Sequence, residues 1–228
     1  MAKIIFVTGT GTDVGKTFIS ALLVHRLKAD YWKAVQTGLE CDTGDTRTIS
    51  KFPTELTDWK PKLFPPRFQF KKPLSPYNAM EFESEVDIKL SDFCIPSADD
   101  LQNDVLIVEG AGGLFVPITK KLEITTDLIR NMIERYPQHE IAIVVVADSG
   151  LGTLNHTMLT VEHLNNHGLG ENFSGCILNG PINVINAKTL RSFGVNILSE
   201  IERCETNQDL SRALNKMPDV HALYVHNK

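Results

Sequence analysis

The sequence predicts an α/β fold, a mostly parallel β-sheet with helices on both of its faces. Two observations predict it. Short apolar, β-branched segments alternate along the chain with segments of helical periodicity, an order that is typical of a parallel sheet covered on both sides. The first apolar segment also leads into a glycine-rich loop and then a helix. Functional loops of such a sheet gather at the carboxyl ends of its strands.

The composition is that of one globular domain, expected over residues 1–228. The chain carries 23 Lys and Arg against 28 Asp and Glu, and the basic residues are scattered, which disfavours nucleic-acid binding. The four cysteines form no C-x-x-C pair, so we expect reduced thiols and a cytoplasmic protein. The sequence shows no signal peptide and no apolar run of about 20 residues, so no membrane partner is expected.

The first strand, loop and helix lie within residues 4–17, IIFVTGTGTDVGKT. Residues 4–7 are apolar and mostly β-branched, as in a buried strand. Gly15, Lys16 and Thr17 then begin an amphipathic helix. This order predicts a phosphate-binding loop (P-loop), in which backbone N–H groups and the helix N-terminus attract phosphate. Lys16 can reach the β- and γ-phosphates, and the Thr17 hydroxyl can ligate Mg²⁺.

The loop is one residue longer than the common P-loop pattern. Thr10 stands where that pattern has glycine, and the nearest glycine is Gly9. An ordinary glycine turn with a surface lysine is the alternative. The strand before the loop and the helix after it favour phosphate binding, and the extra residue indicates a subfamily.

The remaining elements follow from apolar runs and capping residues. Apolar or β-branched runs predict strands at residues 31–35, 104–108, 141–147, 174–179 and 195–198. Helical patterns and cap residues predict helices near residue 45 and at residues 125–135, 154–164, 184–192 and 207–215. Residues 52–76 are rich in proline, so we expect irregular structure packed by aromatic side chains. Residues 83–103 are acidic and are expected to be partly helical.

Three charged residues follow or end predicted strands. Lys33 lies at the end of the second strand, where a lysine can reach a phosphoryl group or can simply be a surface residue. Glu109 ends an apolar strand, where an unpaired charge is costly. Asp45 is either a second carboxylate or a helix cap. A Mg-nucleotide site needs one or two carboxylates beside the loop threonine, so Glu109 is a candidate metal ligand, with a place at a helix N-terminus as its alternative.

Two further strand ends carry candidate nucleotide contacts. Gly110, Ala111, Gly112 and Gly113 permit close backbone approach to a ligand, or else form a tight turn. Asn179 ends another strand, and an Asn amide can pair with both N6 and N7 of adenine. A structural asparagine in the turn before Gly180 is the alternative.

Taken together, these residues resemble one family, dethiobiotin synthetase, which closes the ureido ring in biotin synthesis with ATP. Five stretches in the same order carry the resemblance: residues 8–17, 33–38, 73–76, 109–118 and 151–160. The chain departs from the family at Ala34, where proline is usual, and at Gly11 and Asp13, where Asp and Glu are usual. Beyond residue 198 it lacks a Pro-x-x-Pro pattern.

The resemblance implies roles for the remaining candidates. Lys16 and Lys33 are expected to be catalytic, and Thr17, Asp45 and Glu109 to hold Mg²⁺. The family is homodimeric, and its diamine substrate, which reacts with CO₂, lies between subunits. The substrate contacts implied are Thr37, Leu151, Gly152 and Asn155. The ATP contacts implied, besides Lys16 and the metal ligands, are Thr12, Asp13, Val14, Gly15, Gly110, Ala111, Gly112, Asn179 and Gly180.

Two other functions use the same loop. A partner-switching ATPase of the partition or septum-site type usually has a second lysine early in the loop, and residues 9–15 contain none. A non-catalytic nucleotide-binding module would bind ATP without turnover. Phosphate release that requires both diamine and bicarbonate separates the synthetase from these two alternatives.

Overall fold

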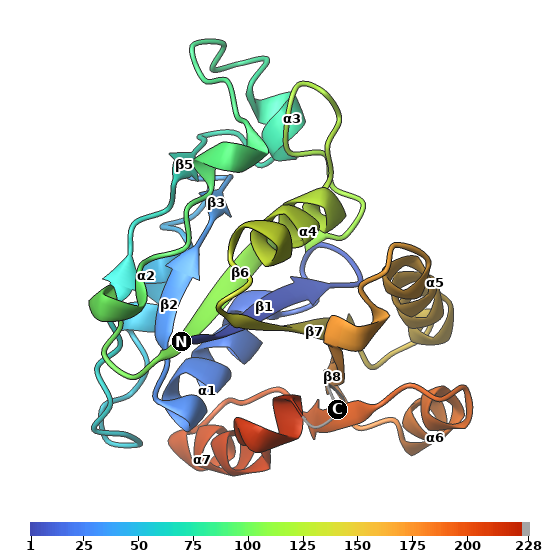
Figure 1. Cartoon of the computed structure of the whole chain (residues 1–228). Coiled ribbons are helices and arrows are strands. Elements are labelled where there is room, and N and C mark those ends of the chain that lie inside the picture. The colour runs from blue at the N-terminus through green and yellow to red at the C-terminus, as the bar shows by residue number, and fades with distance from the viewer. Residues whose placement is uncertain (225–228) are drawn as a thin grey trace.

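A parallel sheet runs through the centre of the molecule in the computed structural model, which describes residues 1–224 (Figure 1). It has seven strands in the order β4-β2-β6-β1-β7-β8-β9, and every pairing between them is parallel. The strands are β1 (Lys3–Gly9), β2 (Asp30–Lys33), β4 (Leu63–Phe64), β6 (Val105–Gly113), β7 (Glu140–Asp148), β8 (Phe173–Asn179) and β9 (Ile197–Ile201). The predicted α/β, P-loop type of sheet is confirmed.

Helices cover both faces of this sheet. Residues of α1 (Lys16–Leu27), α2 (Asp45–Ser50) and α7 (Asn207–Lys216) pack into one core cluster. Residues of α4 (Thr125–Arg135), α5 (Thr153–Asn166) and α6 (Val184–Ser192) pack into the other. Strand β1 contributes side chains to both clusters, because Ile4 and Phe6 point to one face of the sheet and Ile5 and Val7 to the other. The central strand is therefore buried on both sides, as its apolar run predicts.

The strand predicted at residues 31–35 is in fact two strands, and that prediction is wrong in its extent. Strand β2 ends at Lys33, and β3 (Val35–Gln36) pairs with β5 (Phe68–Gln69) in a separate two-stranded sheet. The chain changes partner at Ala34, whose carbonyl accepts a hydrogen bond from the backbone N–H of Arg67. Local sequence cannot specify this change, because the competing partner lies more than thirty positions away.

Other predicted boundaries also shift. The proline-rich segment contains β4 and β5 and leads to the short helix α3 (Pro76–Ala79), capped by Ser75. Residues 83–103 form only two 3₁₀ turns, Leu90–Asp92 and Ala98–Asp100. Strand β6 continues to Gly113 because Gly113 pairs with Gly9 of β1, so the strand predicted at residues 104–108 is longer than predicted. The strand predicted at 195–198 lies at Ile197–Ile201.

The domain prediction covered residues 1–228, of which 225–228 lie outside the described part. None of the helices within residues 1–224 is long and apolar enough to cross a membrane.

Candidate functional site

A cavity of about 760 Å³ opens at the carboxyl ends of β1, β3 and β6. Four separate parts of the sequence form its wall, within residues 12–17, 33–48, 73–76 and 109–116. We call it the central cavity. Its lining residues are Thr12, Asp13, Gly15, Lys16, Thr17, Lys33, Gln36, Thr37, Gly38, Cys41, Asp42, Asp45, Thr48, Pro73, Leu74, Ser75, Pro76, Glu109, Ala111, Gly112 and Val116.

The loop between β1 and α1 forms one wall of the central cavity. Asp13 and Gly15 have positive φ values of 59° and 91°, so the chain turns sharply before α1 begins at Lys16. No side chain caps the N-terminus of α1, which leaves backbone N–H groups available to an anion. This geometry is that of a P-loop.

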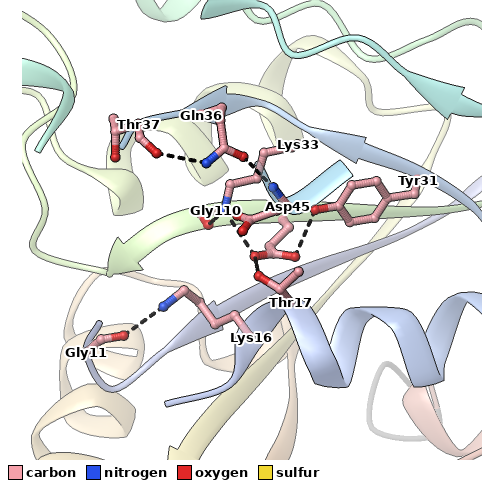
Figure 2. Close-up of polar contacts among 10 residues, drawn as sticks. Gly11, Lys16, Thr17, Tyr31, Lys33, Gln36, Thr37, Asp45 and Gly110 are labelled. Atoms are coloured by element: carbon pink, nitrogen blue, oxygen red, sulfur yellow. Dashed lines mark hydrogen bonds and ion pairs between the residues drawn. The ribbon is translucent and has the colours of Figure 1, made fainter. Parts of the chain in front are cut away.

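Lys16 lies folded back on this loop, with its ammonium donating a hydrogen bond to the Gly11 carbonyl at 2.8 Å (Figure 2). Its side chain is buried, which lowers the pKa of the ammonium, and the neighbouring charge of Lys33 lowers it further. Burial and the Lys33 charge both destabilise the charged form of Lys16. A bound phosphate would offset both, because its oxygens replace the lost solvation and its negative charge balances the two ammonium groups.

Lys33 lies between two carboxylates across neighbouring strands. Lys33 of β2 is in register with Glu109 of β6, so period-two alternation puts both side chains on the same face. The Lys33 ammonium is 3.0 Å from Glu109 Oε1 and 2.5 Å from Asp45 Oδ2, and it donates to the Gly110 carbonyl at 2.8 Å. Lys33 and Glu109 are both almost inaccessible to solvent.

The carboxylates keep this buried lysine charged. Burial alone lowers the pKa of the Lys33 ammonium, but attraction to Glu109 and Asp45 outweighs burial and raises the pKa overall. Burial raises the pKa of the Asp45 carboxyl, and the charge and hydrogen bond of Lys33 outweigh it, so the Asp45 pKa is lowered. Lys33 therefore remains an ammonium group and Asp45 a carboxylate at neutral pH.

Glu109 accepts hydrogen bonds on both of its oxygens. The Thr17 hydroxyl, at the start of α1, donates to Oε1 at 2.9 Å, and the Tyr31 hydroxyl donates to Oε2 at 2.9 Å. Tyr31 is completely buried, and this burial, with the charge of Glu109, raises its pKa well above 10. Tyr31 is therefore a hydrogen-bond donor at neutral pH.

Gln36 holds the loop that carries Asp45. Its side-chain oxygen accepts from the backbone N–H of Asp45 at 2.9 Å, and its nitrogen donates to the Thr37 carbonyl at 2.8 Å (Figure 2). Asp45 is the first residue of α2, so this contact fixes the helix start against β3. The sequence alone indicates no role for Gln36 or Tyr31, although Tyr31 and Lys33 are two residues apart on one strand and so share a face.

Most of the predicted site residues meet at the central cavity. Thr12, Asp13, Gly15, Lys16, Thr17, Lys33, Thr37, Asp45, Glu109, Ala111 and Gly112 line it. Gly110 contributes the carbonyl that accepts from Lys33. Val14 lies within the β1–α1 loop, and its carbonyl accepts a hydrogen bond from the Asn179 amide at 3.0 Å. Gly180 follows at the end of β8. These four residues are not among the lining side chains.

The other predicted substrate residues lie elsewhere on this chain. Leu151, Gly152 and Asn155 are exposed at the N-terminus of α5 and do not line the central cavity. Leu151 is fully exposed. Residues 73–76, from the connection before α3, do line the cavity, although they received no predicted role.

The oxygen atoms near Lys33 fit a hard divalent cation. Thr17 Oγ1, Asp45 Oδ2 and Glu109 Oε1 all lie close to the ammonium or to one another. Mg²⁺ prefers oxygen ligands and is usually held by one or two carboxylates together with substrate phosphates. Residues 1–224 contain no cluster of three His, Cys, Asp or Glu side chains that could hold a metal ion.

Comparison with solved structures supports the fold. A plasmid partition protein of Borrelia burgdorferi B31 bound to AMPPNP has a TM-score of 0.52 and 12% identity, covering 94% of this chain and 95% of that one. A ParA family ATPase of Chlorobium tepidum TLS has a TM-score of 0.54 and 14% identity, covering 95% and 92%. At these identities the likeness shows a shared P-loop NTPase fold and nothing about activity.

Sequence relatives give the family. A family model described as an AAA domain matches residues 3–211. The ATP-dependent dethiobiotin synthetase BioD of Paramagnetospirillum magneticum is 37% identical, covering 87% of both chains, and that of Nitrobacter hamburgensis is 32% identical, covering 98% and 89%. The biotin biosynthesis bifunctional protein BioCD of Bordetella avium is 37% identical over 88% of this chain, which spans only 40% of that protein. The chain belongs to the family of ATP-dependent dethiobiotin synthetases, ligases of biotin biosynthesis.

Proposed function

We propose that this protein joins CO₂ to 7,8-diaminononanoate and closes the ureido ring of dethiobiotin, using ATP and Mg²⁺ and releasing ADP and phosphate. We propose that it acts in the cytoplasm, without nucleic acid or membrane partners. The observation that carries the proposal is the position of Lys33. A buried ammonium lies beside two carboxylates in the same cavity as the P-loop, so a group bound there faces both the phosphate site and a fixed positive charge.

The first step needs an amine and CO₂. A neutral amine of the diamine attacks the carbon of CO₂, a C–N bond forms, and loss of one proton leaves a carbamate anion. The Lys33 ammonium is the positive charge nearest to the carboxylate cluster in the cavity wall, and we assign to it the stabilisation of this anion.

The second step is phosphoryl transfer. A carbamate oxygen attacks the γ-phosphorus of ATP, the bond to the β-phosphate oxygen breaks, and ADP leaves. Such a reaction requires mainly alignment and charge neutralisation from the protein. The loop N–H groups and Lys16 hold the phosphates in this proposal, with Lys16 exchanging the Gly11 carbonyl for phosphate oxygen. When bound, Mg²⁺ would neutralise charge on the triphosphate, held by Thr17, Asp45 and Glu109.

The last step closes the ring. The second amine attacks the carbonyl carbon of the carbamic-phosphoric anhydride, a C–N bond forms, the C–O bond to phosphate breaks, and one proton is lost. The assigned residues include no side-chain nucleophile, because the substrate supplies both attacking amines. We assign to Thr37, which lines the cavity beside Gln36, a contact with the diamine.

The start of α5 is the proposed site for the substrate carboxylate, acting across a homodimer. This 14-residue helix begins after Gly152, whose φ is 92°, and no side chain caps its N-terminus. Uncapped backbone N–H groups at a helix N-terminus attract a carboxylate. Leu151, Gly152 and Asn155 are exposed away from the cavity of their own chain, and so are available to the cavity of a second one.

A coupled assay tests the proposed function. Phosphate release is measured with ATP and Mg²⁺, and then with diamine or bicarbonate omitted in turn. We expect release only when both are present. Release that is independent of both and is stimulated by DNA would contradict the proposal and favour a partition-type ATPase, and nucleotide binding without any release would favour a non-catalytic module.

A further inference from the structure

The two oxygens of Glu109 have partners of different kinds. The donors to Oε1, Thr17 and Lys33, line the central cavity. The donor to Oε2, Tyr31, does not line the cavity and lies completely buried in the core of the sheet. Glu109 therefore presents one oxygen toward the cavity and has the other tied to the protein interior.

The cavity-side donors can release Glu109 more easily than Tyr31 can. The Thr17 hydroxyl can rotate, and the Lys33 ammonium also contacts Asp45 and the Gly110 carbonyl. The Tyr31 hydroxyl has Glu109 as its only hydrogen-bond partner within residues 1–224. Moving Glu109 away would leave that buried hydroxyl without an acceptor, which is unfavourable.

We propose that Tyr31 is a positioning residue that determines which metal this site accepts, an inference that rests on the Mg²⁺ site of the proposed function. By holding Oε2, Tyr31 leaves Glu109 with one oxygen to offer a cation. Mg²⁺ requires near-octahedral geometry with few protein ligands, whereas Ca²⁺ takes six to eight oxygens and often binds both oxygens of one carboxylate. A Glu109 restricted to one oxygen therefore favours Mg²⁺ over Ca²⁺.

Removing one hydroxyl tests this inference. Isothermal titration calorimetry measures the Kd of AMPPNP supplied with excess Mg²⁺ and, separately, with excess Ca²⁺. In the Tyr31→Phe variant, Oε2 is released, and we expect the preference for Mg²⁺ over Ca²⁺ to fall about tenfold, the scale on which the partners of metal ligands act. A purely structural role for Tyr31 would change both Kd values together and leave their ratio unchanged.

Tyr224→Phe is the matched control. Tyr224 is a partly buried tyrosine whose hydroxyl donates to the Ile4 carbonyl at 3.0 Å, and within residues 1–224 its hydrogen bonds do not involve Glu109. This variant should keep the wild-type ratio of the two Kd values. Tyr31→Met, an apolar side chain without the hydroxyl, repeats the measurement if the phenylalanine variant does not fold.

These measurements distinguish a failure of the Tyr31 inference from a failure of the proposed Mg²⁺ site. If Tyr31→Phe keeps the wild-type metal preference, Tyr31 has no role in metal choice, and the inference fails while the proposed function stands. If wild-type protein binds AMPPNP equally well with EDTA as with Mg²⁺, the metal site itself is wrong, and the inference fails with it.

Discussion

Lys33 is the residue on which the proposed chemistry most depends, because its ammonium contacts Asp45, Glu109 and the Gly110 carbonyl at once. Lys33→Gln removes the positive charge while keeping polar atoms. We expect kcat to fall on the order of 10²-fold or more, as when an electrostatic stabiliser of a transition state is lost. Steady-state phosphate release measures it, with Lys62→Gln, a half-exposed surface lysine, as the control. Near-normal turnover of the Lys33 variant would remove Lys33 from the mechanism.

His25 gives a residue-scale prediction about stability. It is buried in the last turn of α1 and stacks on Phe52 with ring centroids 4.1 Å apart, and neither ring nitrogen has a hydrogen-bond partner within residues 1–224. Burial lowers its pKa from 6.5 to about 4. Below about pH 6.5 the unfolded chain binds a proton that the folded protein does not, so stability falls as the pH drops toward 4.

His25→Leu removes this titration. We expect its Tm to decline less than that of the wild type between pH 6.5 and pH 4, as measured by circular dichroism melts. His221→Leu, at an exposed histidine, should leave the wild-type pH dependence unchanged. Parallel Tm curves for wild type and His25→Leu would show that His25 is not the titrating group.

The sequence predicts the charged site residues better than it predicts their supports. Lys16 and Thr17 could be named from the glycine-rich loop that begins a helix after an apolar strand. Lys33, Asp45 and Glu109 could be named because they follow or end apolar strands, where an unpaired charge is costly. Tyr31 and Gln36 could not, because a tyrosine in a strand usually packs in the core, and a glutamine in a strand carries no specific signal. Their roles depend on partners in β6 and α2, which only the folded chain brings together.

At the scale of elements, the β1–α1 loop depends on one glycine. Gly15 has a φ of 91°, and a Cβ there would lie 2.1 Å from the Asn179 side-chain nitrogen. Gly15→Ala therefore strains the backbone and displaces Asn179, and we expect ATP binding to weaken about tenfold or more, matching a strain of order 1–3 kcal/mol. Calorimetric titration with AMPPNP measures the change.

Gly11→Ala is the control for that experiment. A Cβ at Gly11 meets no atom within 4 Å, and Gly11 is not among the glycines with positive φ. Its AMPPNP affinity should stay within about twofold of the wild type, in line with the small effect of unstrained surface changes. If both variants lost AMPPNP affinity equally, any added side chain in the loop would weaken binding, and the positive φ of Gly15 would not be the cause.

Elements with strong local signals were predicted well, and elements defined by distant partners were not. Helices α4 and α6 lie at the predicted residues, because apolar periodicity and capping residues are local. The division of the second strand at Ala34 and the short strands β4 and β5 arise from pairings between segments about 30 positions apart. The extension of β6 through Gly113 likewise needs β1 beside it.

For the whole molecule, we predict that each active site is shared between two subunits. Leu151→Asp places a negative charge at the start of α5 and should repel the substrate carboxylate, and Lys33→Gln disables the cavity. If each site combines the cavity of one subunit with α5 of the other, unfolding and refolding an equal mixture of the two variants should restore about a quarter of wild-type activity, since mixed dimers keep one intact site. An inactive mixture that is dimeric by light scattering would contradict shared sites.

The most direct measurement follows oxygen from bicarbonate to phosphate. The protein is incubated with ATP, Mg²⁺, the diamine and ¹⁸O-labelled bicarbonate, and mass spectrometry detects both dethiobiotin and the released phosphate. Because a carbamate oxygen attacks the γ-phosphorus in the proposed reaction, we expect that dethiobiotin forms and that each phosphate carries one ¹⁸O. Phosphate that takes its new oxygen from water, or the absence of dethiobiotin, would contradict it.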